Sequence, residues 1–103
     1  DVKVNDSLRK YIVRLVNATR QLPEVRLGIS PRGTIALARA ARVYAASRGQ
    51  SYATPDDVKA VAVPVLNHRL LLSAEAEARG EPGEAQRKLV TDLLDTVPVP
   101  GIR

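Results

Sequence analysis

Two helix starts that join a capping residue to a proline constrain the fold of this chain more than any other feature. Ser30 and Thr54 belong to the residue types that cap helices through a side-chain oxygen, and each precedes a proline, which suits the first helical position. Apolar side chains with helical spacing follow both starts. We therefore expect one helix over residues 31–48, ended by Gly49 in a left-handed conformation, and another that begins at Pro55.

We expect three other helical segments, of which the first and the last have the apolar spacing of helices and the second is a short turn that Ser73 can cap. They span residues 6–21, 73–78 and 84–96, and a glycine- and proline-rich loop at residues 79–83 separates the last two. The basic residues on the remaining sides of the first segment are Arg9, Lys10, Arg14 and Arg20. We interpret these side chains as a solvated face.

Two stretches do not continue a regular helix. Pro64 lacks a backbone N–H within the apolar series that follows Pro55, so we expect a break near Val63. Residues 69–73 include three consecutive leucines, which either extend the helix or form a short strand. The predicted fold class is all-α, a small bundle of four to five helices. If residues 69–73 form a strand, the bundle also has a short extended segment there.

The two ends of the chain differ from the helical part. Residues 1–5 alternate without an identifiable partner strand, and we interpret them as a linker. Pro98 and Pro100 push the residues before them out of the helical region, so we expect an extended tail over residues 98–103. A single helical domain then spans residues 6–97, which is enough chain to form one core.

The composition excludes several kinds of site. The chain has no cysteine, which excludes disulfides and thiolate metal sites, and its single histidine, His68, is expected to be a hydrogen-bonded packing residue. No spacing predicts a metal site, and no phosphate-binding loop of the form G-x-x-x-x-G-K-[ST] is present. We therefore do not expect the chain alone to hydrolyse a nucleotide. No apolar run approaches the roughly 20 residues of a membrane span and no signal peptide opens the chain, which predicts a soluble, cytoplasmic protein.

Arg32 falls in the first turn of the helix that follows Ser30 and Pro31. Free backbone N–H groups and the helix dipole favour an anion at this end, so a cation is unfavourable for the helix alone. The arginine is either simply solvated or part of a phosphate site, in which the guanidinium and the dipole hold the same anion. The net charge of +5 fits anionic partners in general, including nucleotide, nucleic acid and acidic protein.

Five blocks of the sequence together resemble the C-terminal helical lid of MoxR-family AAA+ ATPases. The blocks occur in the order and at the spacing of that family and cover almost the whole chain. They are residues 11–20, which begin Tyr11-Ile12-Val13-Arg14, then Leu27-Gly28-Ile29-Ser30-Pro31-Arg32-Gly33, Tyr52-Ala53-Thr54-Pro55-Asp56-Asp57-Val58-Lys59, Val65-Leu66-Asn67-His68-Arg69-Leu70 and Val97-Pro98-Val99-Pro100. The resemblance implies an AAA+ lid fold.

The resemblance also implies a nucleotide site around Arg32. The turn from Gly28 to Gly33 is similar to the family's sensor 2 motif, whose arginine reaches the γ-phosphate of ATP held, with Mg²⁺, by an ATPase core outside this chain. By the same resemblance, Gly28, Ser30 and Gly33 belong to the cofactor-binding turn, where the two glycines let the backbone pass close to the nucleotide. Gly33 departs from the family pattern, which often has alanine at this position.

Further implications concern the first helix and the whole protein. The first helix of such lids forms a wall for adenine, which makes Tyr11 or Ile12 candidate contacts. The full-length protein is then expected to be an ATPase, of which this chain is not catalytic alone, and residues 1–5 are the hinge to its core. The expected partners are that core, the neighbouring subunits of a homo-hexameric, chaperone-like remodelling ring, and proteins with von Willebrand factor A domains.

Two interpretations from other classes remain open. A small basic helical domain could bind DNA, with Arg32, Arg39 and Arg42 as phosphate or base contacts, although the sequence lacks helix-turn-helix spacing. A histone-fold-like interaction module also contains a helix start similar to the one at Thr54. That fold requires a long central helix, which Gly49 is expected to cut short.

Overall fold

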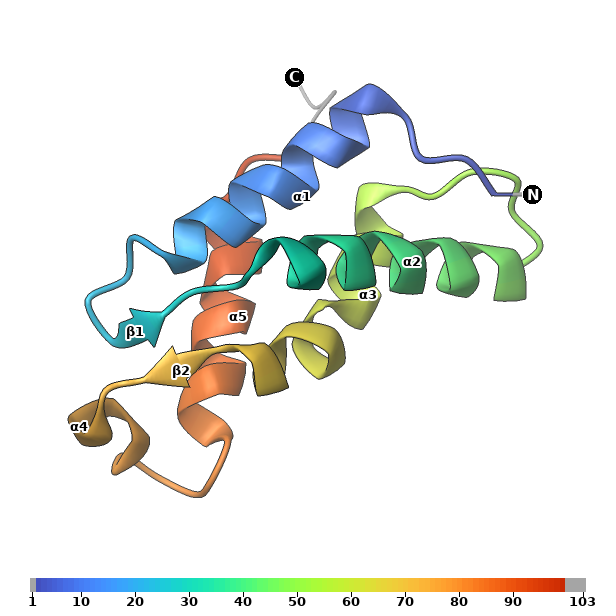
Figure 1. Cartoon of the computed structure of the whole chain (residues 1–103). Helices are drawn as coiled ribbons and strands as arrows, with labels where there is room; N and C mark the ends of the chain where they lie inside the picture. Colours follow the sequence, from blue (N-terminus) through green and yellow to red (C-terminus); the bar gives the residue numbers. More distant parts are fainter. Residues whose placement is uncertain (1, 100–103) are drawn as a thin grey trace.

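Five α-helices, one 3₁₀ helix and two short strands make up residues 2–99, the part of the chain that this computed structural model describes (Figure 1). They are α1 (Asp6–Thr19), β1 (Val25–Leu27), α2 (Pro31–Ser47), α3 (Pro55–Leu66), η1 (Asn67–Arg69), β2 (Leu71–Leu72), α4 (Ala74–Glu77) and α5 (Glu84–Thr96). The predicted helical bundle is confirmed. None of the helices in these residues is both long and apolar enough to span a membrane.

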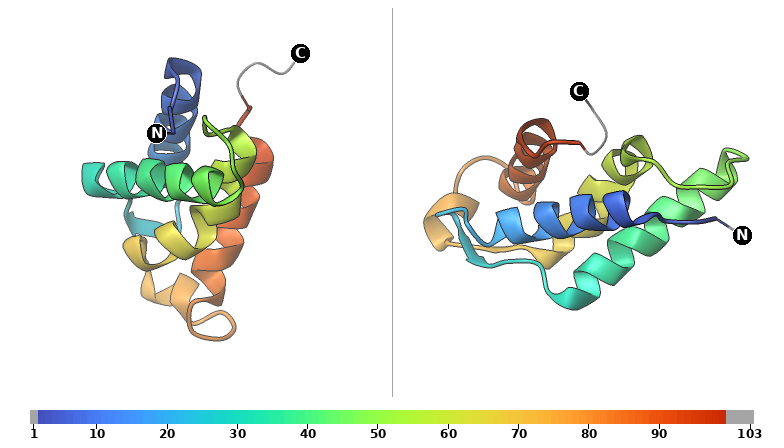
Figure 2. Two further views of the ribbon diagram at one scale, coloured as in Figure 1. Left: turned by 90° about the vertical axis from the view of Figure 1, so that its right-hand side faces the viewer. Right: turned by 90° about the horizontal axis from the view of Figure 1, so that it is seen from above.

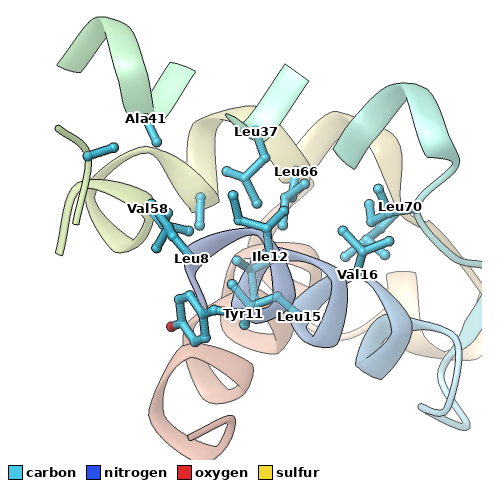
Figure 3. Packing of buried hydrophobic residues seen from close by; sticks show 14 of the residues in the cluster. Leu8, Tyr11, Ile12, Leu15, Val16, Leu37, Ala41, Val58, Leu66 and Leu70 are labelled. Atoms are coloured by element: carbon cyan, nitrogen blue, oxygen red, sulfur yellow. The ribbon is translucent and has the colours of Figure 1, made fainter. Parts of the chain in front are cut away.

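The core lies where the long helices meet. α3 lies between α2 and α5, and α1 packs against all three of them (Figure 2). One face of α1, with apolar residues spaced three and four apart, points into this space (Figure 3). The labelled core residues from the other elements are Leu37, Ala41, Val58, Leu66 and Leu70. Small side chains on the facing sides of α2 and α3, such as the completely buried Ala41, Ala45 and Ala62, allow these two helices to approach closely.

Local signals set most helix ends. α1 begins after Asn5, whose Oδ1 accepts a hydrogen bond from the Leu8 N–H at 2.8 Å, and it ends two residues before the predicted end. α2 ends at Ser47, one residue before the predicted end, and Gly49 has the predicted left-handed conformation, with a φ of +77°, and donates its N–H to the Ala46 carbonyl. Ser73 Oγ accepts from the Ala76 N–H and starts α4.

The expected break near Val63 is wrong, because α3 continues through Pro64 to Leu66. Pro64 lies in the last turn, so the helix loses one hydrogen bond, to the carbonyl of Ala60, and both of these residues are exposed. The chain then enters η1 and the extended β2, which decides the alternatives for residues 69–73 in favour of a short strand. β2 pairs antiparallel with β1, a strand that the sequence did not predict.

The N-terminal segment was expected to lack a partner strand, but it pairs with another part of the chain. The Lys3 N–H donates to the Ser51 carbonyl at 3.0 Å, and the Ala53 N–H donates to the Lys3 carbonyl at 2.9 Å. This parallel bridge attaches the segment to the link between α2 and α3 (Figure 1). At the other end, Pro98 and Val99 follow α5 without regular structure, and the rest of the predicted tail lies outside the described residues.

Candidate phosphate-binding turn at the start of α2

Arg32 is the second residue of α2, and its side chain is exposed. Among residues 2–99 it has no hydrogen-bond or ion-pair partner. The first turn of α2 contains no acidic residue, although the positive end of the helix dipole favours one. The charge of Arg32 is therefore unmatched within the described part of the chain.

The backbone at this helix start also leaves a donor open. Ser30 is the N-cap, but its side chain makes no capping hydrogen bond. The predicted side-chain cap is therefore wrong, and the N–H groups of Gly33 and Thr34 donate only to the Ser30 carbonyl, at 2.9 and 3.3 Å. Pro31 has no N–H, and the N–H of Arg32 has no acceptor among the described residues. Arg32 therefore presents both a backbone donor and a guanidinium at the same helix end.

Ile29, which precedes this turn, is fixed by the end of α1. Its N–H donates to Thr19 Oγ1 at 3.2 Å, and the Thr19 hydroxyl donates to the Val16 carbonyl at 2.6 Å. Arg20 donates from Nη2 to the Ile29 carbonyl at 2.6 Å and from Nη1 to Asn17 Oδ1 at 2.7 Å. Arg20 is exposed, as expected, but it also holds the Ile29 carbonyl, a role that a solvated face does not include. Sequence reasoning missed Thr19 and Arg20 because their role depends on how the chain turns back after α1.

Packing within the domain explains both glycines of the predicted site. A Cβ on Gly28 would lie 2.5 Å from Cγ of Arg20. A Cβ on Gly33 would overlap Cγ2 of Ile29, whose side chain is completely buried. The glycine at position 33 is thus explained by Ile29, which fills the space that a methyl group would need.

Arg69 is a second cation beside this turn, for which the sequence predicted no role. A Cβ on Gly33 would lie 3.4 Å from Cδ of Arg69, so the Arg69 side chain runs past the first turn of α2. The side chain is exposed and has no partner among the described residues. The neighbouring His68 is exposed and its side chain makes no hydrogen bond to the described residues, so its expected packing role is wrong, since η1 directs it outward.

Tyr11 and Ile12 lie in the core (Figure 3), with exposed fractions of 0% and 1%. The Tyr11 hydroxyl has no hydrogen-bond partner among the described residues. Burial, and to a smaller extent the charge of the Asp56 carboxylate, raises the pKa of Tyr11 above its usual value of 10.0. Neither side chain offers a surface to adenine in the described domain, so we do not include them in the candidate site.

Two features of α2 concern the DNA-binding and histone-fold interpretations. Arg32, Arg39 and Arg42 are all exposed on α2, but Arg42 Nε donates to the Val2 carbonyl at 3.1 Å. α2 has 17 residues, and Gly49 ends it where the histone fold needs a longer central helix. Within the described residues, no group of three or more histidine or acidic side chains is placed to hold a metal ion.

Residues 17–91 match the family of AAA lid domains. The chain belongs to this family. It is 43% identical over 100 residues to the uncharacterized protein YeaC of Bacillus subtilis (strain 168), a match that covers 97% of this chain and 30% of YeaC. The lid is also 37% identical to the protein MoxR of Paracoccus denitrificans, over 91% of this chain and 31% of that protein. It is 37% identical to the chaperone MoxR1 of Mycobacterium tuberculosis, over 96% of this chain and 28% of that protein.

A solved structure shows the same fold. The crystal structure of a candidate ATPase from Cytophaga hutchinsonii superposes on the lid with a TM-score of 0.85 and 34% identity, and the match covers 95% of this chain and 32% of that one. The resemblance to the lid of MoxR-type proteins is therefore confirmed. The lid spans about 30% of the length of the curated relatives it matches.

Proposed function

We propose that this lid is part of a longer AAA+ ATPase and that Arg32 is its sensor 2 residue. The observation that supports the proposal is the exposed guanidinium, unpaired among residues 2–99, in a first turn that has no acidic residue. The ATPase core outside this chain would hold ATP and Mg²⁺, and Arg32 would contact the γ-phosphate. Its guanidinium and its backbone N–H, together with the helix dipole, suit a phosphate group, because all three favour negative charge at one point.

The hydrogen bonds around Ile29 support a role in transmitting the nucleotide state. Both the N–H and the carbonyl of Ile29 are bonded to side chains at the end of α1, so a movement of the turn carries α1 with it. We propose that Arg32, when its phosphate contact is lost, releases the lid to rotate as one body. Residues 1–5 remain the proposed link to the core, although rotation about Lys3 requires its two hydrogen bonds to residues 51 and 53 to break.

The proposed assembly follows from the family. We propose that the whole protein works in the cytoplasm as a ring, commonly a homo-hexamer, in which the lid contacts its own core and neighbouring subunits. One relative is named a chaperone, which supports a chaperone-like remodelling role. Partners with von Willebrand factor A domains are an expectation from the family resemblance alone.

Substitution of Arg32 by alanine in the full-length protein tests the role. We expect kcat for ATP hydrolysis to fall about 100-fold or more, because a preorganised cation at developing phosphate charge is lost. ATP affinity, measured with a fluorescent analogue, is expected to change less than about 10-fold, since the core holds most of the nucleotide. Arg32→Ala with normal hydrolysis would overturn the sensor 2 assignment.

Two further variants are the controls. Arg87→Ala removes an exposed, unpaired arginine of α5, and we expect hydrolysis within about twofold of the parent protein. Arg69→Ala removes the second cation beside the turn, and its effect is expected to be smaller than that of Arg32→Ala, because only Arg32 lies within the first turn of α2. A loss with Arg87→Ala as large as with Arg32→Ala would show that general surface charge, rather than the turn, determines activity.

A further inference from the structure

The outward side of α2 exposes apolar side chains that the proposed function does not use. Ile35, Val43 and Tyr44 are 54%, 69% and 37% exposed, and they make up half of the large apolar side chains that are exposed among the described residues. Ile35, Arg39 and Val43 follow one another at four-residue spacing and therefore form one ridge along the helix. We call Ile35, Arg39, Arg42, Val43 and Tyr44 the α2 outer face.

Two shallow grooves flank this ridge. The groove towards α3 has a volume of about 520 Å³ and is lined by Arg39, Ala40, Val43, Tyr44, Ser47 and Val61. The groove towards the N-terminal segment has a volume of about 380 Å³ and is lined by Val2, Arg39, Arg42, Val43 and Ala46. Arg39 and Val43 belong to both grooves, so they form the divide between them.

The charge of this region is unbalanced. Residues 25–55 contain five arginines and no acidic residue. Arg48 pairs with Asp57 and Arg42 donates to the Val2 carbonyl, but Arg39 has no partner among the described residues. An exposed arginine between two exposed aliphatic side chains fits a surface that offers a carboxylate flanked by apolar groups.

We propose that the α2 outer face is a docking surface for an acidic amphipathic helix of a partner protein. The carboxylates of that helix pair with Arg39 and its apolar side chains cover Ile35 and Val43. The distance from Ile35 to Ser47 along α2 is about 18 Å, which is room for a helix of about three turns packed into one of the grooves. Nucleic acid is a poorer occupant, because a phosphate backbone leaves Val43 uncovered. The proposal is independent of the role of Arg32, which lies at the start of the helix.

The test uses the full-length protein and a designed probe. The probe is a fluorescein-labelled peptide of about 14 residues with leucines on one helical face and glutamates beside them, and its affinity is measured by fluorescence anisotropy. We expect Arg39→Glu to weaken binding about 10-fold or more and Val43→Ser about 5-fold. The same peptide with lysines in place of the glutamates should bind Arg39→Glu more tightly than it binds the parent chain.

Controls separate this surface from general charge and apolarity. Arg87→Glu on α5 and Val13→Ser on α1 change exposed residues elsewhere, and each is expected to change the affinity less than twofold. Circular dichroism checks that the variants fold. Equal weakening by Arg87→Glu, or no weakening by Arg39→Glu, overturns the proposal. Tighter binding of duplex DNA than of the peptide to the same face, or self-association of the chain that Arg39→Glu abolishes, overturns it in favour of those occupants.

Discussion

The starts of α2 and α3 combine the same residue types, a hydroxyl residue and a proline, but the hydrogen bonds and charges around them differ. At α3, Thr54 Oγ1 accepts from the Asp57 N–H at 3.3 Å, and Asp57 Oδ2 accepts from the Thr54 N–H at 2.8 Å. Arg48 Nη1 pairs with Asp57 Oδ1 at 3.0 Å. At α2, the N-cap side chain makes no capping bond, and the first turn carries an arginine instead of an acid.

The difference separates a structural helix start from one that is open to a ligand. At α3 the donors and charges satisfy one another inside the domain, so this start contributes to stability. At α2 the turn is held from outside the helix, through Ile29 and the end of α1, and its own donor and cation have no partner in the described part of the chain. The same local sequence pattern therefore does not by itself distinguish the two roles.

Asp57→Ala is expected to give the largest change, a loss of about 3 kcal/mol in the free energy of unfolding. The substitution removes the acceptor of the Thr54 N–H and of the Arg48 guanidinium at a completely buried position. Urea denaturation measures this loss. Arg32→Ala at the other helix start should change the same free energy by less than about 0.5 kcal/mol. Equal losses in the two variants would contradict the distinction.

Gly33→Ala is expected to cost about 2 kcal/mol, because the new methyl group overlaps Cγ2 of Ile29. Ile29→Ala also destabilises the domain through lost burial, but it opens the space that the methyl group needs. The double variant should therefore lose less stability than the sum of the two single variants, by about 1 kcal/mol or more. A double-mutant cycle in urea gives this coupling, and strictly additive losses would show that the two side chains do not compete for space.

The two caps provide a smaller and more direct comparison. Thr54→Ala is expected to lower the free energy of unfolding by about 1 kcal/mol, because the Asp57 N–H loses its side-chain acceptor and Asp57 Oδ2 loses the Thr54 hydroxyl donor. Ser30→Ala should cost less than about 0.3 kcal/mol, since the Ser30 side chain makes no capping bond. Thermal unfolding of both variants at one pH is sufficient. A loss with Ser30→Ala that matches Thr54→Ala would mean that Ser30 caps α2 in solution.

Arg32→Glu is expected to have only a small effect on stability, and in the opposite direction. An acid in the first turn of α2 favours the helix dipole, so the free energy of unfolding should rise by about 0.5 kcal/mol at low salt. In the full-length protein the same change should lower ATP hydrolysis at least as far as Arg32→Ala. A variant that is destabilised at low salt would show that Arg32 has a structural partner.

The helices could be predicted because their signals act within a few residues. α5 begins and ends at the predicted residues, Glu84 and Thr96, since Gly83 precedes it and Pro98 follows it. α2 ends at Ser47, one residue before the predicted end. Gly49, which follows it, adopts the expected left-handed conformation. Capping residues, prolines and apolar spacing are sufficient for elements of this kind.

Pairings between distant segments could not be predicted in the same way. β1 spans only Val25–Leu27, too short for an alternating pattern, and its partner β2 lies more than 40 residues later in the sequence. Lys3 pairs with an irregular link that carries no signal of a strand. For the candidate site, the position of Arg32 in the first turn of α2 followed from local signals. The contributions of Arg20 and Arg69 depend on how α1 and η1 pack beside the turn, so the sequence could not place them.

The Ile29 side chain fills the space that a side chain at position 33 would need, which limits the substitutions that these two positions tolerate in related lids. A mutation to alanine at position 33 meets the isoleucine methyl group, and a smaller residue at position 29 alone leaves a void next to glycine. Each single exchange therefore gives a less stable protein, and the paired exchange loses less stability than the sum of the two single exchanges. The two positions are expected to covary among lids of this type, a large residue at 29 occurring with glycine at 33 and a small one with alanine.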